Sequence, residues 1–369
     1  MRIAPLFSIG LVVAVVATAA GQDAPHVIQN VEVFNEPGRF AGWPANNGIW
    51  SWGDEIVVGF TLGYHKDVTS GHTIDRERPS EPQQARSLDG GQTWTIEGPS
   101  YVGEDGKARK SVSLSSPIDF SHPDFAARFR THQFSYSFDR CRTWQGPFEL
   151  PTFGRPGLLA RTDYLVEGKH RLTAFVAAQK QGGNEGQPLC IRTTDGAKTW
   201  KLVGWIGQQP PASYGYAIMP ATVALDGDSY LSIIRRSGVF NGEKRWWLEA
   251  FLSPDDGRSW YRLDQPQIDN AGNPATLNRL EDGRIALVYG WRHAPYGIRS
   301  RLSSDDGATW GPEIILRADG RTWDLGYPRT VQRADGNLVT AYYFNDTSQV
   351  GRFIAATIWS PGKAGPPQH

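Results

Sequence analysis

The chain alternates between short apolar stretches and turns that contain glycine and aspartate. One recurring unit consists of a proline, an apolar stretch, a Gly or Asp-Gly turn and a second apolar stretch. Such a unit predicts a β-hairpin, because two runs of strand length flank residues that tolerate positive φ. The unit occurs at residues 44–58, 220–234, 274–288 and 328–340, with looser versions that begin at Pro117 and Pro156.

A second recurring feature is an octapeptide of the form Ser/Thr-x-Asp-x-x-x-Ser/Thr-Trp, called the Asp box below. Its copies stand at residues 87–94, 137–144, 193–200, 253–260 and 303–310, and they begin 50, 56, 60 and 50 residues apart. Self-similarity at such a period is typical of a propeller or a solenoid. A short Asp side chain accepts hydrogen bonds from the backbone amides that follow it, so we expect these aspartates to hold turns rather than to do chemistry.

Together the two features predict a repeat of four antiparallel strands, which is a propeller blade. The inner strands are expected to begin at Pro44, Pro117, Pro156, Pro220, Pro274 and Pro328. The sequence therefore predicts an all-β, six-bladed propeller over residues 26–360. Residues 26–34 form a strand without a partner of its own, and we expect this strand to close the last blade and remove a sheet edge.

The composition fits this architecture and limits the classes of partner that the protein is expected to bind. The chain has 369 residues, of which 41 are Gly, and one closed propeller can use that whole length. Lys+Arg and Asp+Glu number 38 each, so no overall field favours nucleic acid or an anionic membrane. Any anion site has to be built locally.

Cys141 and Cys190 are the two cysteines of the chain. They allow at most one disulfide and no cysteine-based metal cage. A bridge between adjacent repeats stays open beside the favoured alternative, which is two unpaired cysteines that act as small hydrophobic residues.

The two ends of the chain lie outside the repeats. Residues 1–21 have a basic start, an apolar run from Leu6 to Ala20 and a small-residue end, which is typical of a cleaved signal peptide. The run is shorter than the roughly 20 residues that a spanning helix needs, so we expect a secreted or periplasmic protein without a membrane anchor. The Pro- and Gly-rich residues 361–369 are expected to be disordered.

Five Asp boxes within a six-blade pattern resemble the sialidase (neuraminidase) superfamily over residues 26–360. The resemblance implies a sugar site on the propeller axis, at the face away from the boxes. It also implies a carboxylate clamp of three arginines, a tyrosine nucleophile paired with a glutamate, and an aspartate as the acid/base. Neither a metal nor another cofactor is implied.

The resemblance places the nucleophile at Tyr327, which opens the sixth inner strand in Asp324-Leu-Gly-Tyr327-Pro-Arg329. A neutral phenol avoids repulsion as it attacks beside a carboxylate. A core tyrosine at a strand start is the alternative interpretation. The acid/base loop corresponds to residues 70–78, where Asp75 is the candidate and His72 is a second one. An ion pair of Asp75 with neighbouring arginines is the structural alternative.

The clamp candidates are arginines near the ends of inner hairpins. Arg235 and Arg236 end the first hairpin of blade four, and only one of them can face the axis because adjacent strand residues point to opposite sides. Arg292 has the corresponding place in blade five, and the other candidates are Arg39 and Arg329. Guanidinium suits bidentate recognition of a carboxylate.

The sequence departs from the family pattern at two places. Gly42 stands where the family has an arginine two residues before the proline of the first blade. The start of the fourth inner strand, residues 217–222, contains no acid although the family has a glutamate there.

Asp119 and His122, which precede the second Asp box, are further candidates for substrate contacts. With Asp124 they have the side-chain types of metal ligands, but no second cluster completes a site, so no metal is expected.

Three functions agree with these observations. The first is a hydrolase that removes a terminal, carboxylated sugar from a glycan. The second is a lyase on uronate-containing polysaccharide, in which Tyr327 or a histidine moves protons and arginine neutralises the carboxylate. The third is a propeller that binds glycans without cleaving them. The oligomeric state is left open.

Overall fold

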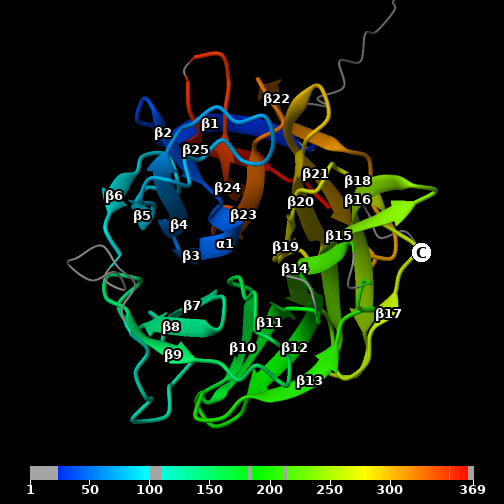
Figure 1. Ribbon diagram of the computed structural model, residues 1–369. Helices are drawn as coiled ribbons and strands as arrows, with labels where there is room; N and C mark the ends of the chain where they lie inside the picture. The colour runs from blue at the N-terminus through cyan, green and yellow to red at the C-terminus, as the bar shows by residue number, and fades with distance from the viewer. Residues whose placement is uncertain (1–23, 100–109, 182–184, 212–213, 349, 365–369) are drawn as a thin grey trace, which may run out of the picture.

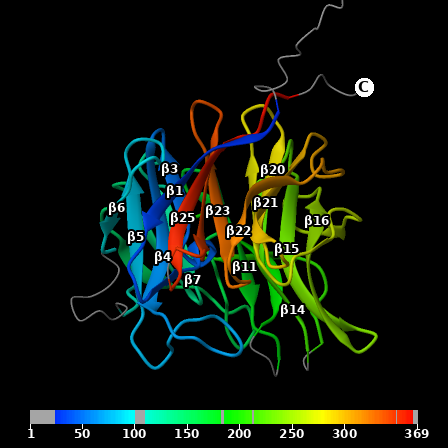
Figure 2. The same cartoon turned by 90° about the horizontal axis from the view of Figure 1, so that it is seen from above.

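The computed structural model describes residues 24–99, 110–181, 185–211, 214–348 and 350–364, and everything below refers to these residues. Six antiparallel sheets surround a central axis, as Figure 1 shows in face view and Figure 2 in side view. The predicted all-β, six-bladed propeller is thereby confirmed. The predicted signal peptide, residues 1–21, lies outside the described residues.

The first three blades contain the strands up to residue 205. Blade one consists of β2 (Arg39–Gly42), β3 (Ile49–Trp52), β4 (Glu55–Tyr64), β5 (Glu81–Ser87) and β6 (Thr95–Glu97), with the single-turn helix α1 (Pro44–Asn47) between β2 and β3. Blade two consists of β7 (Ala126–Arg130), β8 (Gln133–Ser137) and β9 (Gln145–Glu149). Blade three consists of β10 (Tyr164–Gly168), β11 (Arg171–Ala178), β12 (Gln187–Thr193) and β13 (Lys201–Trp205).

The last three blades complete the ring. Blade four consists of β14 (Tyr216–Ala224), β15 (Tyr230–Phe240), β16 (Glu243–Ser253) and β17 (Tyr261–Arg262), and β18 (Ile268–Asp269) also pairs with β16. Blade five consists of β19 (Ala275–Arg279), β20 (Ile285–Trp291), β21 (Tyr296–Ser303) and β22 (Ile314–Gly320). Blade six consists of β23 (Gly326–Gln332), β24 (Leu338–Phe344), β25 (Phe353–Ser360) and β1 (His26–Phe34).

The N-terminal strand closes the ring, as predicted. β1 pairs antiparallel with β25 from His26 opposite Ser360 to Phe34 opposite Ile354. Blade six is therefore made from both ends of the propeller, which leaves no unpaired strand start there. The amide of Ala41 in blade one also donates a 2.8 Å hydrogen bond to the carbonyl of Arg352 in blade six.

The middle strands are buried along their length because neighbouring blades cover both faces of each sheet. All seven residues of β24 are buried, and so are nine of the ten residues of β4. This explains why these segments read as continuous apolar runs rather than as alternating patterns.

Blade two differs from the prediction. Within the described residues it has three strands, and the inner strand expected to begin at Pro117 is not formed, so that part of the prediction is wrong. Instead, Ile118 donates its amide hydrogen bond to Gly196 and Phe120 donates to Lys169, both in blade three. The inner position is taken by β7, whose Ala127 carbonyl accepts a hydrogen bond from Trp50 of blade one.

The box aspartates hold their own turns, as expected. In the last box the Asp305 carboxylate accepts hydrogen bonds from the Thr309 amide at 2.8 Å, the Thr309 hydroxyl at 2.5 Å and the Ser303 hydroxyl at 2.8 Å. In the first box the same set of donors outweighs partial burial and lowers the pKa of Asp89 to about 2. These carboxylates use their acceptor positions within the turn, so we assign them a structural rather than a catalytic role.

Both cysteines are buried and free, and burial raises the pKa of the Cys190 thiol to about 12. Residues 365–369 of the tail that was predicted to be disordered lie outside the described residues, and in its described part Pro361 is buried and its carbonyl accepts a 2.9 Å hydrogen bond from Arg284. Arg284 also holds the carbonyl of Gly362 at 2.7 Å. No helix among the described residues is long and apolar enough to cross a membrane.

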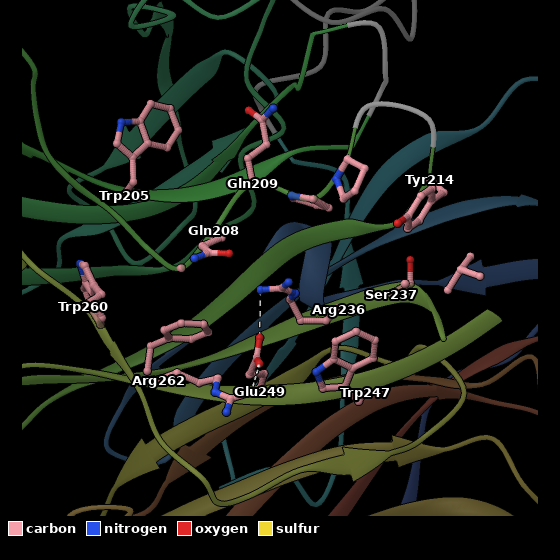
Figure 3. Close-up of a pocket in the computed structure, with 16 residues that line it drawn as sticks. Trp205, Gln208, Gln209, Tyr214, Arg236, Ser237, Trp247, Glu249, Trp260 and Arg262 are labelled. Atoms are coloured by element: carbon pink, nitrogen blue, oxygen red, sulfur yellow. Dashed lines mark ion pairs between the residues drawn. The ribbon is translucent and has the colours of Figure 1, made fainter. Parts of the chain in front are cut away.

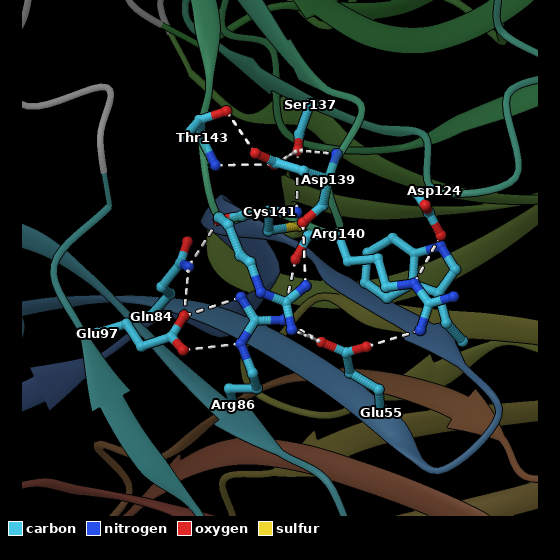
Figure 4. Close-up of polar contacts among 12 residues, drawn as sticks. Glu55, Gln84, Arg86, Glu97, Asp124, Ser137, Asp139, Arg140, Cys141 and Thr143 are labelled. Atoms are coloured by element: carbon cyan, nitrogen blue, oxygen red, sulfur yellow. Dashed lines mark hydrogen bonds and ion pairs between the residues drawn. The ribbon is translucent and has the colours of Figure 1, made fainter.

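An ionic cluster joins blades one and two near their boxes, as Figure 4 shows. The buried Glu55 carboxylate accepts hydrogen bonds from Arg86 at 2.7 Å, Arg140 at 2.9 Å and Arg142 at 3.0 Å. Burial alone would raise the pKa of Glu55, but these three guanidinium groups lower it. Arg86 also pairs with Glu97 at 2.7 Å, so its charge is balanced within the sheet.

Glu55→Gln is expected to lower the free energy of unfolding by roughly 3 kcal/mol, because it removes the charge of a buried carboxylate that three guanidinium groups share. Denaturant unfolding followed by tryptophan fluorescence measures this change. The matched control is Glu36→Gln, whose carboxylate is 52% exposed and 3.4 Å from Arg39, and which is expected to cost less than about 1 kcal/mol. Equal losses in the two variants would contradict the role given to the cluster.

Candidate functional site at the hub

Three residues of blades one, four and six have an unusual backbone conformation. Trp43, Met219 and Tyr327 have φ values of 62°, 54° and 51°, although each of them precedes a proline. A non-glycine residue in the left-handed region is strained, and strain of this kind gathers at functional sites. The pairing of blades four and six is irregular at the same places, between Ile218 and Ala221 and between Gly326 and Arg329.

Side-chain hydrogen bonds fix the strained turn at Tyr327. The Tyr327 amide donates to Oδ1 of Asn273 at 2.9 Å, and Nδ2 of Asn273 donates to the Leu325 carbonyl at 2.7 Å. Gly326 has a φ of 103°, and a Cβ there would lie 2.2 Å from Asn273, so the turn needs glycine at this position. The result is a tyrosine held in one orientation.

The Tyr327 hydroxyl accepts a 3.0 Å hydrogen bond from Arg235, and the tyrosine is 6% exposed. The Arg292 guanidinium lies 5.5 Å from the centre of the Tyr327 ring. The rings of His72 and Tyr343 meet the Tyr327 ring edge-on at 5.8 and 5.9 Å. Residues from blades one, four, five and six therefore meet around one phenol.

Arg235 and Arg236 point to opposite sides of β15, as strand geometry requires. Arg235 faces Tyr327 and lies 4.9 Å over the Tyr216 ring. Within the described part of the chain, the buried Nε of Arg235 has no hydrogen-bond partner. Arg236 instead pairs with Glu249 at 2.9 Å on the other face of the sheet.

Arg292 is held by the protein itself. Its guanidinium donates to the carbonyl of Leu325 at 3.2 and 3.1 Å, to the carbonyl of Gly272 at 3.2 Å and to the Tyr343 hydroxyl at 2.9 Å. These contacts orient the charge toward the site and use most of its donors.

Arg161 in blade three is a third guanidinium at the hub. It donates to Oδ1 of Asn46 at 2.8 Å and to the carbonyl of Ala160 at 2.9 Å. Burial lowers the pKa of Arg161, and so does the charge of Arg235, whereas Tyr327 acts in the opposite direction. Three guanidinium groups therefore share one region, which favours an anionic ligand.

His72 and Asp324 form a hydrogen-bonded pair next to Tyr327. Nδ1 of His72 lies 2.6 Å from the Asp324 carboxylate, which also accepts hydrogen bonds from the Thr73 amide at 2.9 Å and the Tyr343 hydroxyl at 2.8 Å. An ionised carboxylate only accepts hydrogen bonds, so Nδ1 carries the proton in neutral His72 and Nε2 has a free lone pair.

The pKa values of Asp324 and His72 both lie below their ordinary values. Burial alone would raise the pKa of Asp324, but hydrogen bonds from His72 and Thr73 and the charge of Arg352 lower it well below its usual value. Burial lowers the pKa of His72 despite the hydrogen bond to Asp324, and the charge of Arg292 adds to this effect. The pair is therefore a carboxylate and a neutral imidazole at neutral pH.

A carboxylate also lies near the arginines. Glu185, between β11 and β12, is half-buried and interacts electrostatically with Arg161, Arg235 and Tyr216. It comes from another blade than the glutamate that the family pattern places at residues 217–222.

The hub site comprises Tyr327, Arg161, Arg235, Arg292, His72 and Asp324. It lies at the end of the propeller away from the boxes. His72 belongs to the loop that precedes β5, and the first box follows β5, so the two stand at opposite ends of that strand.

Asp75 and Arg39 lie outside the hub site. The Asp75 carboxylate accepts a hydrogen bond from the Glu77 amide at 3.1 Å and lies 3.6 Å from Lys66. Arg39 donates to the Gly63 carbonyl at 2.8 Å and lies over the ring of Tyr64. The loop that was expected to supply an aspartate thus brings His72 to Tyr327.

Asp119 and His122 lie at the opposite face, because the segment around them bonds to the turns of blade three and packs on the second box. Asp119 bonds to Ser121 and lies 3.7 Å from Lys169. The His122 ring lies 4.8 Å from the Phe138 ring of the box. These two candidates for substrate contacts therefore lie on the box side, away from the hub site.

Arg329 lies along the axis among the inner strands. It donates to the Ala45 carbonyl at 2.9 Å and to the Thr162 carbonyl, and it lines an axial cavity of about 320 Å³ with Asp163. Burial raises the pKa of Asp163 to about 7 although the charge of Arg329 opposes this shift.

Among the described residues, no group of three or more His, Cys, Asp and Glu side chains is placed to hold a metal ion.

Sequence reasoning gave no role to Asp324, Arg161, Tyr343 or Glu185. Asp324 stands three residues before Tyr327, and Arg161 stands five residues after Pro156 of the repeat pattern, so the position of each was a signal that could have found it. Tyr343 lies within an apolar strand and Glu185 lies outside the repeat pattern, so nothing local marks them.

These observations define a class of protein, a six-bladed propeller with Asp boxes on one face and a cluster of arginine, tyrosine and histidine on the other. The chain belongs to the family of BNR repeat-like domains, whose model matches residues 121–340. The resemblance found in the sequence is thereby confirmed for the family and the fold. No curated protein sequence matches significantly.

Solved structures share the propeller over most of the chain. A protein of unknown function from Dyadobacter fermentans has 22% sequence identity and a TM-score of 0.66, covering 91% of this chain and 99% of its own. An α-L-arabinanase of Penicillium chrysogenum complexed with arabinobiose has 17% identity, a TM-score of 0.58 and coverage of 90% and 98%. The NanB sialidase of Streptococcus pneumoniae, as its K499G mutant, has 13% identity, a TM-score of 0.58 and coverage of 89% and 70%. These similarities show a common fold.

Proposed function

We propose that the protein is a glycoside hydrolase that removes a terminal, carboxylated sugar from a glycan at the hub site. The observation that carries the proposal is Tyr327, held in a strained turn and hydrogen-bonded to one of three guanidinium groups that surround it. Structural neighbours that bear the names of a sialidase and an arabinanase support glycoside hydrolysis on this fold. The arginines favour the carboxylated sugar over a neutral arabinose unit.

In the proposed reaction the arginines bind the sugar carboxylate and Tyr327 attacks the anomeric carbon. The phenol gives its proton to Glu185 as the new bond forms, and Arg235 stabilises the developing phenolate. Protonated His72 donates a proton from Nε2 to the leaving oxygen as the glycosidic bond breaks. Water then cleaves the sugar–tyrosine bond, with neutral His72 as the base and with the proton returned to Tyr327.

A lyase on uronate-containing polysaccharide is the second candidate, and the His72–Asp324 pair favours it. A neutral imidazole oriented by a carboxylate is a good general base, able to take the proton next to the sugar carboxylate. The arginines would neutralise that carboxylate, and Tyr327 would give its proton to the leaving oxygen. The product would be an unsaturated uronate.

Product analysis separates the two reactions. Hydrolysis of an uronate or sialic-acid glycan releases a saturated sugar with one added water, whereas elimination produces absorbance near the ultraviolet maximum of an unsaturated uronate. Mass spectrometry in H₂¹⁸O reads the same difference, because label enters the sugar during hydrolysis alone. A product without label and with ultraviolet absorbance overturns the hydrolase.

The pH dependence of the rate gives a second reading. The pKa of His72 is lowered below its ordinary 6.5, so the hydrolase, which needs protonated His72 for bond cleavage, is expected to lose kcat as pH rises through that lowered value. The lyase needs neutral His72 and is expected to lose kcat as pH falls through it. A profile of kcat from pH 4 to 9 shows whether kcat falls as pH rises or as pH falls. The same profile for His72→Gln identifies the limb that depends on His72.

We also propose that the protein works outside the cytoplasm, as the apolar start of the sequence suggests. Cell fractionation and N-terminal sequencing of the exported protein test this proposal.

A further inference from the structure

A groove of about 760 Å³ lies away from the hub, between blades three and four (Figure 3). It is reached from the face of β15 that carries Arg236, whereas Arg235 on the opposite face belongs to the hub site. Its walls combine tryptophans with charged and amide side chains, chiefly Trp205, Trp247, Trp260, Gln208, Glu249 and Arg262. The hub site and the groove therefore share a strand but not a cavity.

Two tryptophans of the groove, Trp205 and Trp260, are half-buried and held by contacts with neighbouring residues. The Arg155 guanidinium lies 4.3 Å over the Trp205 ring and holds Gln209 by a 2.6 Å hydrogen bond. Trp260 stacks on Tyr230 with ring centres 6.4 Å apart, and its indole N–H donates to the Gly257 carbonyl at 3.0 Å. Rigid, half-exposed aromatic faces provide a contact surface at little cost in conformational entropy.

The floor of the groove carries two guanidinium groups. Glu249 is paired with Arg236 at 2.9 Å and with Arg262 at 3.6 Å, and Arg262 also lies 3.9 Å from the exposed carboxylate of Asp264. The Arg236 and Glu249 side chains are 16% and 7% exposed, whereas that of Arg262 is 55% exposed. Arg262 is therefore the guanidinium group of this floor that an anionic ligand can reach.

The groove continues across β16. A second hollow of about 340 Å³ shares Trp247, Glu249 and Arg262 with it and adds Trp246, Arg245, Gln267 and Asp269. Two adjoining hollows with aromatic walls fit a chain of several sugars better than a single compact ligand.

We propose that this groove is a second glycan-binding site, which holds a carboxylate-bearing oligosaccharide by stacking sugar rings on Trp247 and Trp205 and by pairing a carboxylate with Arg262. The charge and the polar floor favour this ligand over an apolar peptide, for which charged groups in the groove would be desolvated at a cost. The groove works independently of catalysis at the hub.

Affinity electrophoresis in gels that contain polygalacturonate tests the proposal, with neutral linear arabinan as the comparison polymer. The Tyr327→Phe background removes turnover during the run. Polygalacturonate is expected to retard the protein more than arabinan does, and Trp247→Ala or Arg262→Gln is expected to weaken this retardation about tenfold. Tyr261→Ala is the matched control, because Tyr261 is 60% exposed and lies beside Trp260 without lining the groove.

Arg262 is exposed, so Arg262→Gln tests binding even if Trp247→Ala disturbs folding. The proposal is overturned if polygalacturonate fails to retard the protein, if arabinan retards it as strongly, or if the groove variants behave like Tyr261→Ala. With Tyr327 intact, the groove variants are expected to keep kcat on a small chromogenic glycoside within about twofold. Loss of that activity would mean that the groove is not a separate site.

Discussion

Tyr327→Phe is expected to reduce turnover about 10³-fold or more, because it removes the hydroxyl that forms or protonates a bond in both proposed reactions. The phenylalanine ring keeps the contacts with His72 and Tyr343, so the fold is expected to remain. Steady-state kinetics on the substrate identified by product analysis, with the thermal unfolding midpoint recorded alongside, measures the effect.

Tyr342→Phe is the matched control for this variant. Tyr342 is the buried neighbour of Tyr343 in β24, and its hydroxyl lies 2.6 Å from that of Thr357 on the side away from Tyr327. Its loss is expected to cost about 1 kcal/mol of stability and to leave kcat unchanged. If Tyr327→Phe keeps both turnover and glycan binding, the hub site is not where the reaction occurs. If no turnover is found in the unmodified protein and binding survives in Tyr327→Phe, the protein is a glycan-binding propeller.

The fold could be predicted from the sequence because its information is repeated. Each Asp box encodes a complete turn in eight residues, and the apolar hairpins between boxes have the length of strands. Blade two shows the limit of this reasoning. Its Pro117 has the local form of a strand start, yet Ile118 and Phe120 bond to blade three. That choice depends on the neighbouring blade rather than on the local pattern.

Only those hub residues that occupy equivalent positions in the repeated hairpins could be predicted from the sequence. Tyr327, Arg235 and Arg292 occupy equivalent ends of inner hairpins, and the structure brings all three together. Loop residues carry no such register. Asp75 and His72 lie three residues apart on one loop, and tertiary contact with Asp324 decides which of them enters the site.

The residues that orient the catalytic candidates are also difficult to recognise in the sequence, because they come from several blades. Asp324 and Tyr343 are 1% and 0% exposed, and Tyr343 reads as one more aromatic residue of a core strand. Its role is visible only in the hydrogen bonds that it makes with Arg292 and Asp324, at 2.9 and 2.8 Å. Polar connections between strands far apart in sequence have no local signature.

Asp324→Asn is expected to lower kcat about 100-fold or more, because an amide can no longer fix the His72 tautomer. The carboxylate accepts the Nδ1–H of His72 and leaves Nε2 directed to the site. An asparagine can donate to Nδ1 instead, which moves the proton to Nε2 and removes the base. The hydrogen bond to Asp324 also raises the pKa of His72 against the effect of burial. Its loss is therefore expected to move the His72 limb of the pH profile further toward acid.

The shift of the pH profile separates an orienting role from a merely structural one. Asp324 also pairs with Arg352 at 3.3 Å, so some loss of stability is expected in any case. Instability alone lowers the amount of active enzyme without moving the pH limb.

Asp75→Asn is the control on the same loop as His72. Its carboxylate bonds to Glu77 and Lys66 outside the hub site, and we expect kcat within about twofold of the unmodified protein. A large loss in Asp75→Asn with an unchanged profile in Asp324→Asn would transfer the acid/base role from His72 to Asp75.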